Sequence, residues 1–346
     1  MNHQHSVSPP RRVVLAGGSG FLGQALADHL EARGWEVVIL SRSANANATI
    51  SCPGRRWVQW DGCSAGSWAV ELEGASALIN LTGLSVNCRY HAANRRRLLD
   101  SRLLPTHLLG EAVARCTRPP AVWLNSSTAT IYRHTFGPAW SEDGEIGAHP
   151  DANDAFSIEI ATAWEREFAA APTPRTRKVT LRTAMVLGHG RNSVFPTLRR
   201  LVRLGLGGSM AGGRQFVSWI HERDFCRAVE WLIAREDISG VINLAAPAPV
   251  TNAAMMSILR ELCGVPFGLP ATRWMLAVGA FLLRTETELI VKSRRVVSGR
   301  LAEAGFAFQF PTLREAFQDL MMSRTTWPAT SVRRMSRPPN RNVSCS

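Results

Sequence analysis

The stretch RVVLAGGSGFLG, residues 12–23, places a short apolar run directly before a cluster of glycines. An apolar run of this length that ends in glycine is typical of a buried parallel strand, here residues 13–17. From 21 to 33 leucines recur every four residues, which predicts a helix with one apolar face that stops at Gly34. A second apolar run follows at 36–40. This order of strand, glycine turn, helix and strand predicts a βαβ unit.

The glycines of this turn stand where a dinucleotide site needs a bare backbone. Gly17 allows a tight turn, Gly20 lets a pyrophosphate approach the chain, and Gly23 lets the helix pack closely on the strand. The helix N-terminus presents free N–H groups and a positive dipole end to the phosphates. The alternative is a glycine turn without a ligand. We predict that a dinucleotide contacts Gly17, Gly20, Phe21, Leu22 and Gly23.

The end of the second strand indicates which dinucleotide is bound. A site for NAD places Asp or Glu there to bind the ribose 2′-hydroxyl, whereas this chain has Ser41 and Arg42. A hydroxyl and a guanidinium suit a 2′-phosphate. These two residues predict NADP(H) as the cofactor, and the alternative is an arginine that merely caps a surface loop.

The rest of the chain continues the alternation of strands and helices to about residue 250. Further strands are predicted at 77–81, 122–125, 179–182 and 241–244, and helices at about 92–116, 155–170 and 222–235. This rhythm predicts an α/β fold with a doubly wound parallel sheet, a Rossmann domain over 12–250.

The C-terminal part of the sequence has a different texture. Residues 251–322 are predicted to form a small, mostly helical lobe, with helices near 252–262, 271–283 and 311–320. The two ends of the chain, 1–11 and 325–346, are expected to be disordered because they offer little to bury.

The composition indicates a globular chain, with 346 residues of which 45% are hydrophobic. The net charge of +13 raises the question of an anionic partner. Almost all basic residues are arginines, Lys178 and Lys292 being the only lysines, and they are dispersed without interleaved aromatics. We therefore favour solvated faces or ligand-pocket arginines over a nucleic-acid platform.

Targeting and metal-binding signals are not found in the sequence. The first ten residues do not resemble a secretory signal, and the longest apolar run, 274–283, is about half of the roughly 18–20 residues that span a bilayer. The seven cysteines form no CxxC pair or zinc-like spacing, so we expect reduced thiols and no metal site. We expect a cytoplasmic protein with a small-molecule partner of unknown identity and no membrane contact, and pairing into a homodimer stays open.

Longer motifs give the chain a family resemblance over about residues 12–321. It resembles the extended short-chain dehydrogenase/reductase superfamily and, within it, the NAD-dependent epimerase/dehydratase-like family with a C-terminal domain of unknown function. The motifs that carry the resemblance are GGSGFLG (17–23), INLTG (79–83), NSSTATIY (125–132), LRTAMVLG (181–188), GGRQFVSWIHERD (212–224) and NLAAPAPVTN (243–252).

The resemblance implies roles for five further residues. Asp61 would face the adenine amino group. Leu81, Thr82 and Gly83 would line the phosphate and ribose side of the cofactor. Thr128 matches the Ser or Thr that hydrogen-bonds the reacting oxygen in active epimerases and dehydratases, although β-propensity alone also accounts for a Thr in a strand.

The chain departs from the superfamily at its catalytic pair. Active members use a Tyr as general acid and base, with a Lys four residues later that lowers the Tyr pKa. The only tyrosines here are Tyr90 and Tyr132, and neither is followed by such a lysine. In the helix where the pair belongs, the expected positions hold Ser157 and Ala161.

Two other residues are candidates for the missing acid. Tyr132 ends the strand that borders the nicotinamide pocket, where a neighbouring arginine would lower its pKa; the alternative is an aromatic side chain packed over the cofactor. His221 is the second candidate; the alternative is that this histidine starts a helix or has its hydrogen bonds satisfied in the core.

The sequence leaves two functions open. One is an NADP(H)-dependent oxidoreductase or epimerase-like enzyme that acts on a carbonyl or sugar-nucleotide-like compound, and the other is a non-catalytic NADP(H)-binding sensor or scaffold.

Overall fold

The computed structural model of the protein describes residues 11–42, 54–190, 193–272, 274–276 and 288–322. Its centre is a seven-stranded sheet in the order β10-β6-β5-β4-β1-β2-β3, in which all neighbours are parallel. The strands are β1 (Arg12–Ala16), β2 (Glu36–Ser41), β3 (Arg55–Gln59), β4 (Ala77–Asn80), β5 (Val122–Thr128), β6 (Arg177–Thr183) and β10 (Gly240–Leu244). The predicted doubly wound parallel sheet is confirmed.

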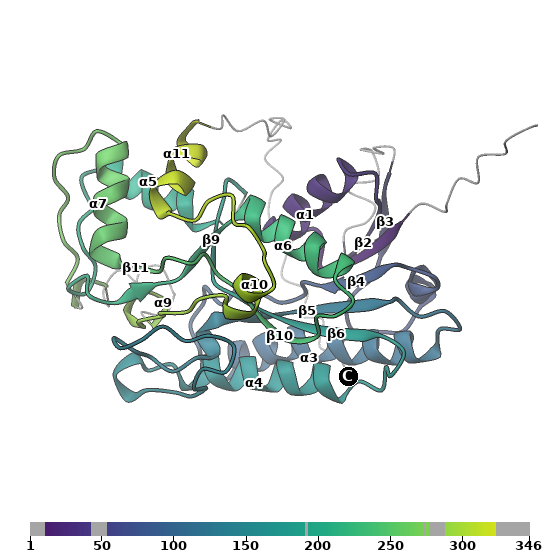
Figure 1. Cartoon of the computed structure of the whole chain (residues 1–346). Helices are drawn as coiled ribbons and strands as arrows, with labels where there is room; N and C mark the ends of the chain where they lie inside the picture. Colours follow the sequence, from purple (N-terminus) through teal and green to yellow (C-terminus); the bar gives the residue numbers. More distant parts are fainter. Residues whose placement is uncertain (1–10, 43–53, 191–192, 273, 277–287, 323–346) are drawn as a thin grey trace, which may run out of the picture.

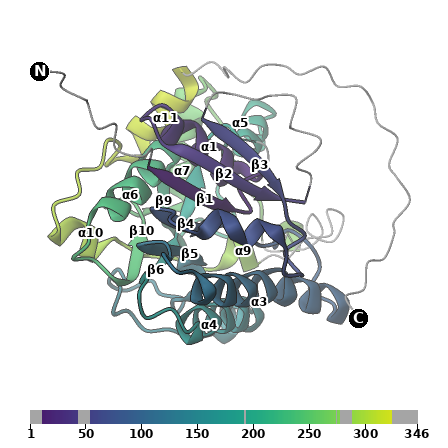
Figure 2. The same cartoon turned by 90° about the vertical axis from the view of Figure 1, so that its right-hand side faces the viewer.

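Helices cover both faces of this sheet. They are α1 (Phe21–Glu31) and α6 (Glu222–Ala234) on one face, and α3 (Ala92–Arg115) and α4 (Ala155–Ala170) on the other (Figure 1). The central strands are mostly apolar because both of their faces are buried, as in residues 13–16 of β1 and 77–79 of β4. The strand order reverses between β1 and β4 (Figure 2). In folds of this class, ligands bind beyond the carboxyl ends of the strands at such a reversal.

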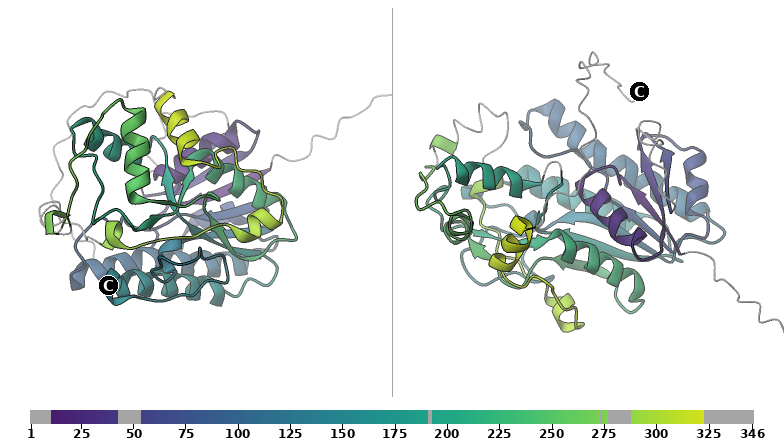
Figure 3. Two further views of the ribbon diagram at one scale, coloured as in Figure 1. Left: turned by 60° about the vertical axis from the view of Figure 1, so that its left-hand side comes forward. Right: turned by 90° about the horizontal axis from the view of Figure 1, so that it is seen from above.

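A second lobe stands at one end of the sheet, as Figures 1 and 3 show for α5, α7 and α11. Its elements are β7 (Met185–Leu187), α5 (Val194–Arg203), β8 (Phe216–Val217), β9 (Trp219–His221), β11 (Val250–Thr251), α7 (Asn252–Leu262), α9 (Glu288–Val291) and α11 (Leu313–Met322). One hydrophobic cluster joins Phe195 of α5, Met256 of α7 and Phe317 of α11. The lobe therefore draws on residues both before and after 251.

The described residues also form several shorter elements. α10 (Gly299–Glu303) packs beside β10, and three turns of 3₁₀ helix are η1 (Ser67–Leu72), η2 (Ala129–Ile131) and η3 (Pro150–Ala152). Within the described parts of the chain, no helix is both long enough and apolar enough to cross a bilayer.

The structure differs from the sequence-based expectation at a few elements. Strand β3 is not among the predicted strands, and β5 and β6 are longer than predicted. The predicted helix at 271–283 falls largely outside the described residues, although 274–276 are helical. The two expected disordered ends also lie outside them, apart from Arg11, whose guanidinium lies over the Trp35 ring.

Candidate cofactor and substrate site

The glycine turn between β1 and α1 is shaped by two close backbone approaches. Gly17 has φ 75°, and a Cβ there would lie 2.9 Å from the backbone nitrogen of Thr82. A Cβ on Gly23 would lie 2.4 Å from the Cα of Gly18. The turn therefore tolerates no side chain at either position, and α1 packs directly on the loop that follows β1.

The start of α1 leaves backbone donors at the surface of this turn. The first backbone bond of the helix runs from the N–H of Gln24 to the carbonyl of Gly20, so the N–H groups of Phe21, Leu22 and Gly23 lie before it. No side chain caps the helix and its first turn holds no acidic residue. A Cβ on Gly20 would meet nothing closer than 3.7 Å. This open, positive helix end fits a diphosphate.

The Phe21 side chain packs against the loop that follows β7, whereas its backbone N–H lies at the start of α1. The loop after β7 passes so close to the Phe21 ring that a Cβ on Gly190 would lie 2.0 Å from it. Glu222 at the start of α6 accepts a bond of 3.4 Å from the N–H of His189 in the same loop. The glycine turn is thus packed against the second lobe.

The tip of β2 lies next to the glycine turn. The N–H of Gly17 donates to the carbonyl of Leu40 over 3.2 Å, which joins the turn to the end of β2. Ser41 is buried and Arg42 is exposed directly after it. A guanidinium in this position can reach the ribose of a nucleotide whose diphosphate lies on α1.

Asp61 lies at the tip of the neighbouring strand, β3. Its carboxylate accepts bonds from the N–H groups of Cys63 (2.8 Å) and Ser64 (2.9 Å) and from the Ser64 hydroxyl (2.6 Å). Partial burial opposes ionisation, but these hydrogen bonds outweigh it and lower the Asp61 pKa. The side chain organises its own turn and remains exposed at the end of the strand.

Leu81, Thr82 and Gly83 follow β4 on the other side of the glycine turn. The N–H of Leu81 donates to the carbonyl of Ala16 over 2.8 Å. Both the N–H and the hydroxyl of Thr82 donate to the side-chain oxygen of Asn80, at 3.1 and 2.6 Å. Asn80 therefore fixes the strand end that faces the turn.

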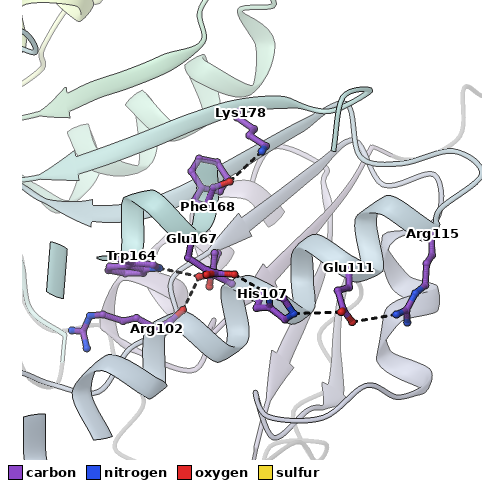
Figure 4. Close-up of polar contacts among 10 residues, drawn as sticks. Arg102, His107, Glu111, Arg115, Trp164, Glu167, Phe168 and Lys178 are labelled. Atoms are coloured by element: carbon purple, nitrogen blue, oxygen red, sulfur yellow. Dashed lines mark hydrogen bonds and ion pairs between the residues drawn. The ribbon is translucent and has the colours of Figure 1, made fainter. Parts of the chain in front are cut away.

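Asn80 belongs to a buried polar network that the sequence analysis did not find. Its amide donates to Asn125 (2.7 Å) on β5 and to the Thr106 hydroxyl (3.0 Å) on α3. Trp164 of α4 donates to the same hydroxyl over 3.0 Å, and Figure 4 shows this side chain between the two helices. The network ties the end of β4 and the middle of β5 to α3 and α4, and in the sequence only the two asparagines hint at it.

A cavity of about 410 Å³ opens beyond the carboxyl ends of β5 and β6. Thr128, the last residue of β5, lines it together with residues of β6, β7, α5, α7 and the segment after α9. The Thr128 hydroxyl accepts a bond of 3.1 Å from the N–H of Thr130. Since a hydroxyl that accepts a bond still carries a donor proton, Thr128 can donate to an oxygen in the cavity.

Tyr132 points away from this cavity and is not among its lining residues. Its buried hydroxyl donates to Asn243 over 2.8 Å and accepts from Arg182 over 3.0 Å. Arg182 in turn forms a bidentate pair with Glu165 at 2.8 Å. Burial outweighs the effect of Arg182 and raises the Tyr132 pKa. The expected lowering of this pKa is therefore wrong, and a catalytic role of Tyr132 stays a prediction that this geometry does not favour.

Two polar residues of the motif 212–224, the candidate acid His221 and Arg214, are not among the residues that line the cavity. His221 is buried, stacks on Phe310 with 3.9 Å between ring centroids, and caps α6 by accepting the N–H of Arg223 over 3.0 Å. It is thus the helix-start histidine that the sequence analysis weighed against a catalytic one. Arg214 is exposed, and its guanidinium lies 5.8 Å from the Phe136 ring centroid.

Comparison with known proteins places this architecture in a family. The model of the NAD dependent epimerase/dehydratase family matches residues 13–245, from β1 to just past β10. The chain belongs to this family. A domain of unknown function, DUF1731, matches residues 271–320. The resemblance found in the sequence is thereby confirmed for both parts of the chain.

Relatives within the family match along almost their whole length. Epimerase family protein SDR39U1 of Bos taurus is 31% identical over 314 residues, 90% of this chain and 99% of the relative. Epimerase family protein MT2273 of Mycobacterium tuberculosis is 31% identical over 307 residues, 88% and 95% of the two chains. The crystal structure of human SDR39U1 (isoform2) with NADPH has 28% identity and a TM-score of 0.76, and it covers 89% of this chain and 98% of its own.

Helix α4 is the helix in which the resemblance led us to expect a Tyr–Lys pair. Here Ser157 bonds through its hydroxyl to the carboxylate of Glu288 on α9. Asp154, the residue directly before α4, forms an ion pair of 2.5 Å with Lys292, and both side chains are buried. Lys292 also donates to the carbonyl of Thr130 over 2.5 Å. Glu288 and Lys292 of the second lobe thus contact the start of α4. No local sequence signal predicts these long-range contacts.

Proposed function

We propose that this chain binds NADP(H) along the carboxyl edge of its sheet. The observation that carries the proposal is the bond between Gly17 and Leu40, which sets the open helix end of α1 beside the tip of β2. The first would hold the diphosphate and the second, through Ser41 and Arg42, the 2′-phosphate. The human relative solved with NADPH supports the same cofactor. Asp61 at the tip of β3 would face the adenine.

We propose further that the cofactor serves an oxidoreductase or epimerase-like reaction on a small carbonyl compound. When bound, the nicotinamide supplies or accepts a hydride. Thr82 and Gly83 would position the ribose, and Thr128 would donate a hydrogen bond to the reacting oxygen. A sugar-nucleotide-like substrate is the alternative within the same reaction class. We also propose that the protein acts in the cytoplasm.

The experiment is turnover of NADPH by the purified chain with a panel of ketones, aldehydes and nucleotide sugars. Thr128→Val is expected to lower kcat at least tenfold with NADPH affinity unchanged. Thr117→Val, at an exposed threonine that does not line the cavity, serves as the control with the same measurements. Tyr132→Phe would lower the rate by at least tenfold if this tyrosine were the acid, and an unchanged rate removes it from the mechanism. A Thr128→Val enzyme as fast as the parent would contradict the proposed role of Thr128.

A second candidate is a non-catalytic NADP(H)-binding sensor or scaffold. It is favoured by the pairing of Ser157 with Glu288 at the place of the missing catalytic pair. Under this proposal NADPH binds, but no member of the panel is converted. Turnover of any compound eliminates it.

A further inference from the structure

The cavity beyond β5 and β6 has mainly apolar walls. Most of the side chains that line it are apolar; they come largely from β7, β8, α5, α7 and α9 and include Met185, Met210 and Met255. Three of them are methionines, whose flexible side chains adapt to apolar ligands. None of these described lining residues is acidic.

Two cations from the segment after α9 form the charged part of the wall. Lys292 is held by the Thr130 carbonyl and Asp154, each at 2.5 Å. The Nε of Arg294 donates to the Thr130 hydroxyl over 3.1 Å. Both cations therefore meet at Thr130, two residues from Thr128, so that charge and candidate reaction centre lie at one end of the cavity.

The carboxylates that balance these cations do not line the cavity. Asp154 holds Lys292, and Glu288 is bonded to Ser157 of α4. The described lining of the cavity therefore carries two cations and no carboxylate, although Asp154 and Glu288 balance the cluster as a whole. An arginine held in place by its neighbours is suited to bidentate recognition of a carboxylate.

We propose that this cavity takes a small, otherwise largely apolar molecule with a single carboxylate, which Arg294 binds at the Thr128 end with Lys292 beside it. A nucleotide sugar would place its many hydroxyls against apolar walls that offer them few partners. This inference rests on the proposed function only because it takes the cavity to be the substrate site. Binding of the carboxylate can be measured without turnover.

The test is calorimetric titration of the full chain with matched acids and alcohols, with and without saturating NADPH. The probes are hexanoate against hexanol, 3-phenylpropanoate against 3-phenylpropanol, and UDP-glucose. We expect at least one acid to bind tenfold more tightly than its alcohol. Arg294→Gln should abolish this difference and leave the alcohol's affinity unchanged. Arg294→Lys should retain part of it.

Two further readouts keep the result decisive. Ala184→Leu narrows the apolar part of the cavity, so it should weaken acid and alcohol equally. Arg294→Lys replaces Arg294→Gln as the test variant if the latter does not fold. The proposal is overturned if no acid is favoured over its alcohol, or if UDP-glucose binds more tightly than every acid. If NADPH itself does not bind, the proposed cofactor is contradicted. The acid titrations without NADPH still test the proposal for the cavity.

Discussion

Two glycines of the first turn, Gly20 and Gly23, differ in what a methyl group would meet. Gly20 has an extended backbone that alanine also adopts, and its Cβ would meet nothing within 3.7 Å. Gly20→Ala should therefore keep the fold but obstruct the diphosphate, weakening NADPH binding at least tenfold. Gly23→Ala places its Cβ 2.4 Å from the Gly18 backbone and should cost about 2–3 kcal/mol in the free energy of unfolding.

Urea unfolding and NADPH titration of both glycine variants separate the two roles. Equal losses of stability in the two variants, or normal NADPH affinity in a stable Gly20→Ala protein, would contradict the assignment of Gly20 to the cofactor.

Helix α6 begins at a buried histidine and gives the protein a pH-dependent stability. Burial is the main cause that lowers the His221 pKa to about 4; Arg223 lowers it too, while Asp319 and Asp224 oppose the shift. The folded chain thus holds His221 neutral, whereas the unfolded chain protonates it near 6.5. Stability should therefore fall as the pH drops from 6.5 toward 4, by up to about 1.4 kcal/mol per pH unit from this group.

The His221→Asn variant isolates this contribution, because asparagine keeps an acceptor for the N–H of Arg223. We expect it to be less stable than the parent at pH 7.5 but to lose less stability between pH 6.5 and 4.5 in urea titrations. Parallel pH profiles of the two proteins would show that His221 does not titrate as described.

Helices α4 and α9 are joined by the buried pair of Asp154 and Lys292. Lys292→Met leaves a buried carboxylate without its partner and should cost about 3–5 kcal/mol in unfolding free energy. The double variant with Asp154→Asn should recover part of this loss because no buried charge is left unpaired. Lys178→Met is the control, since Lys178 donates to three backbone carbonyls, those of Phe168, Ala169 and Ala171.

Denaturation of the parent, the single variants Lys292→Met and Asp154→Asn, and the double variant gives the coupling between the two side chains. Strictly additive losses in this cycle would mean that the pair contributes nothing specific to holding the second lobe on α4.

The elements that the sequence predicts best are those with a buried, continuous apolar run. β1 and β2 were predictable because both faces are covered. β3 was not, because this edge strand, RRWVQ, is only partly buried and carries arginines that pair with helix carboxylates, as Arg55 does with Glu31 over 2.6 Å. Charged residues at an edge give no apolar signal that marks a strand.

Across the molecule as a whole, the parts of the site that could be predicted from the sequence are those formed by residues close together in the chain. The cofactor edge follows from local patterns, since the glycine turn and the tip of β2 lie within thirty residues of each other. The cavity does not, because Lys292 and Thr130 meet across 162 positions of the chain. Tyr132 was expected beside the nicotinamide, but the turn η2 that follows β5 directs it to Arg182 and Asn243.

The most direct test of the whole account is equilibrium titration of the folded full chain with NADPH and with NADH, followed by NADPH fluorescence. We predict saturable binding with a clear preference for NADPH. Arg42→Ala should reduce that preference by about tenfold or more, as expected when a charge-assisted bond is removed. Arg96→Ala, on the exposed side of α3, should leave both affinities unchanged. Well-folded protein that shows no saturable NADPH binding would contradict the account at its centre.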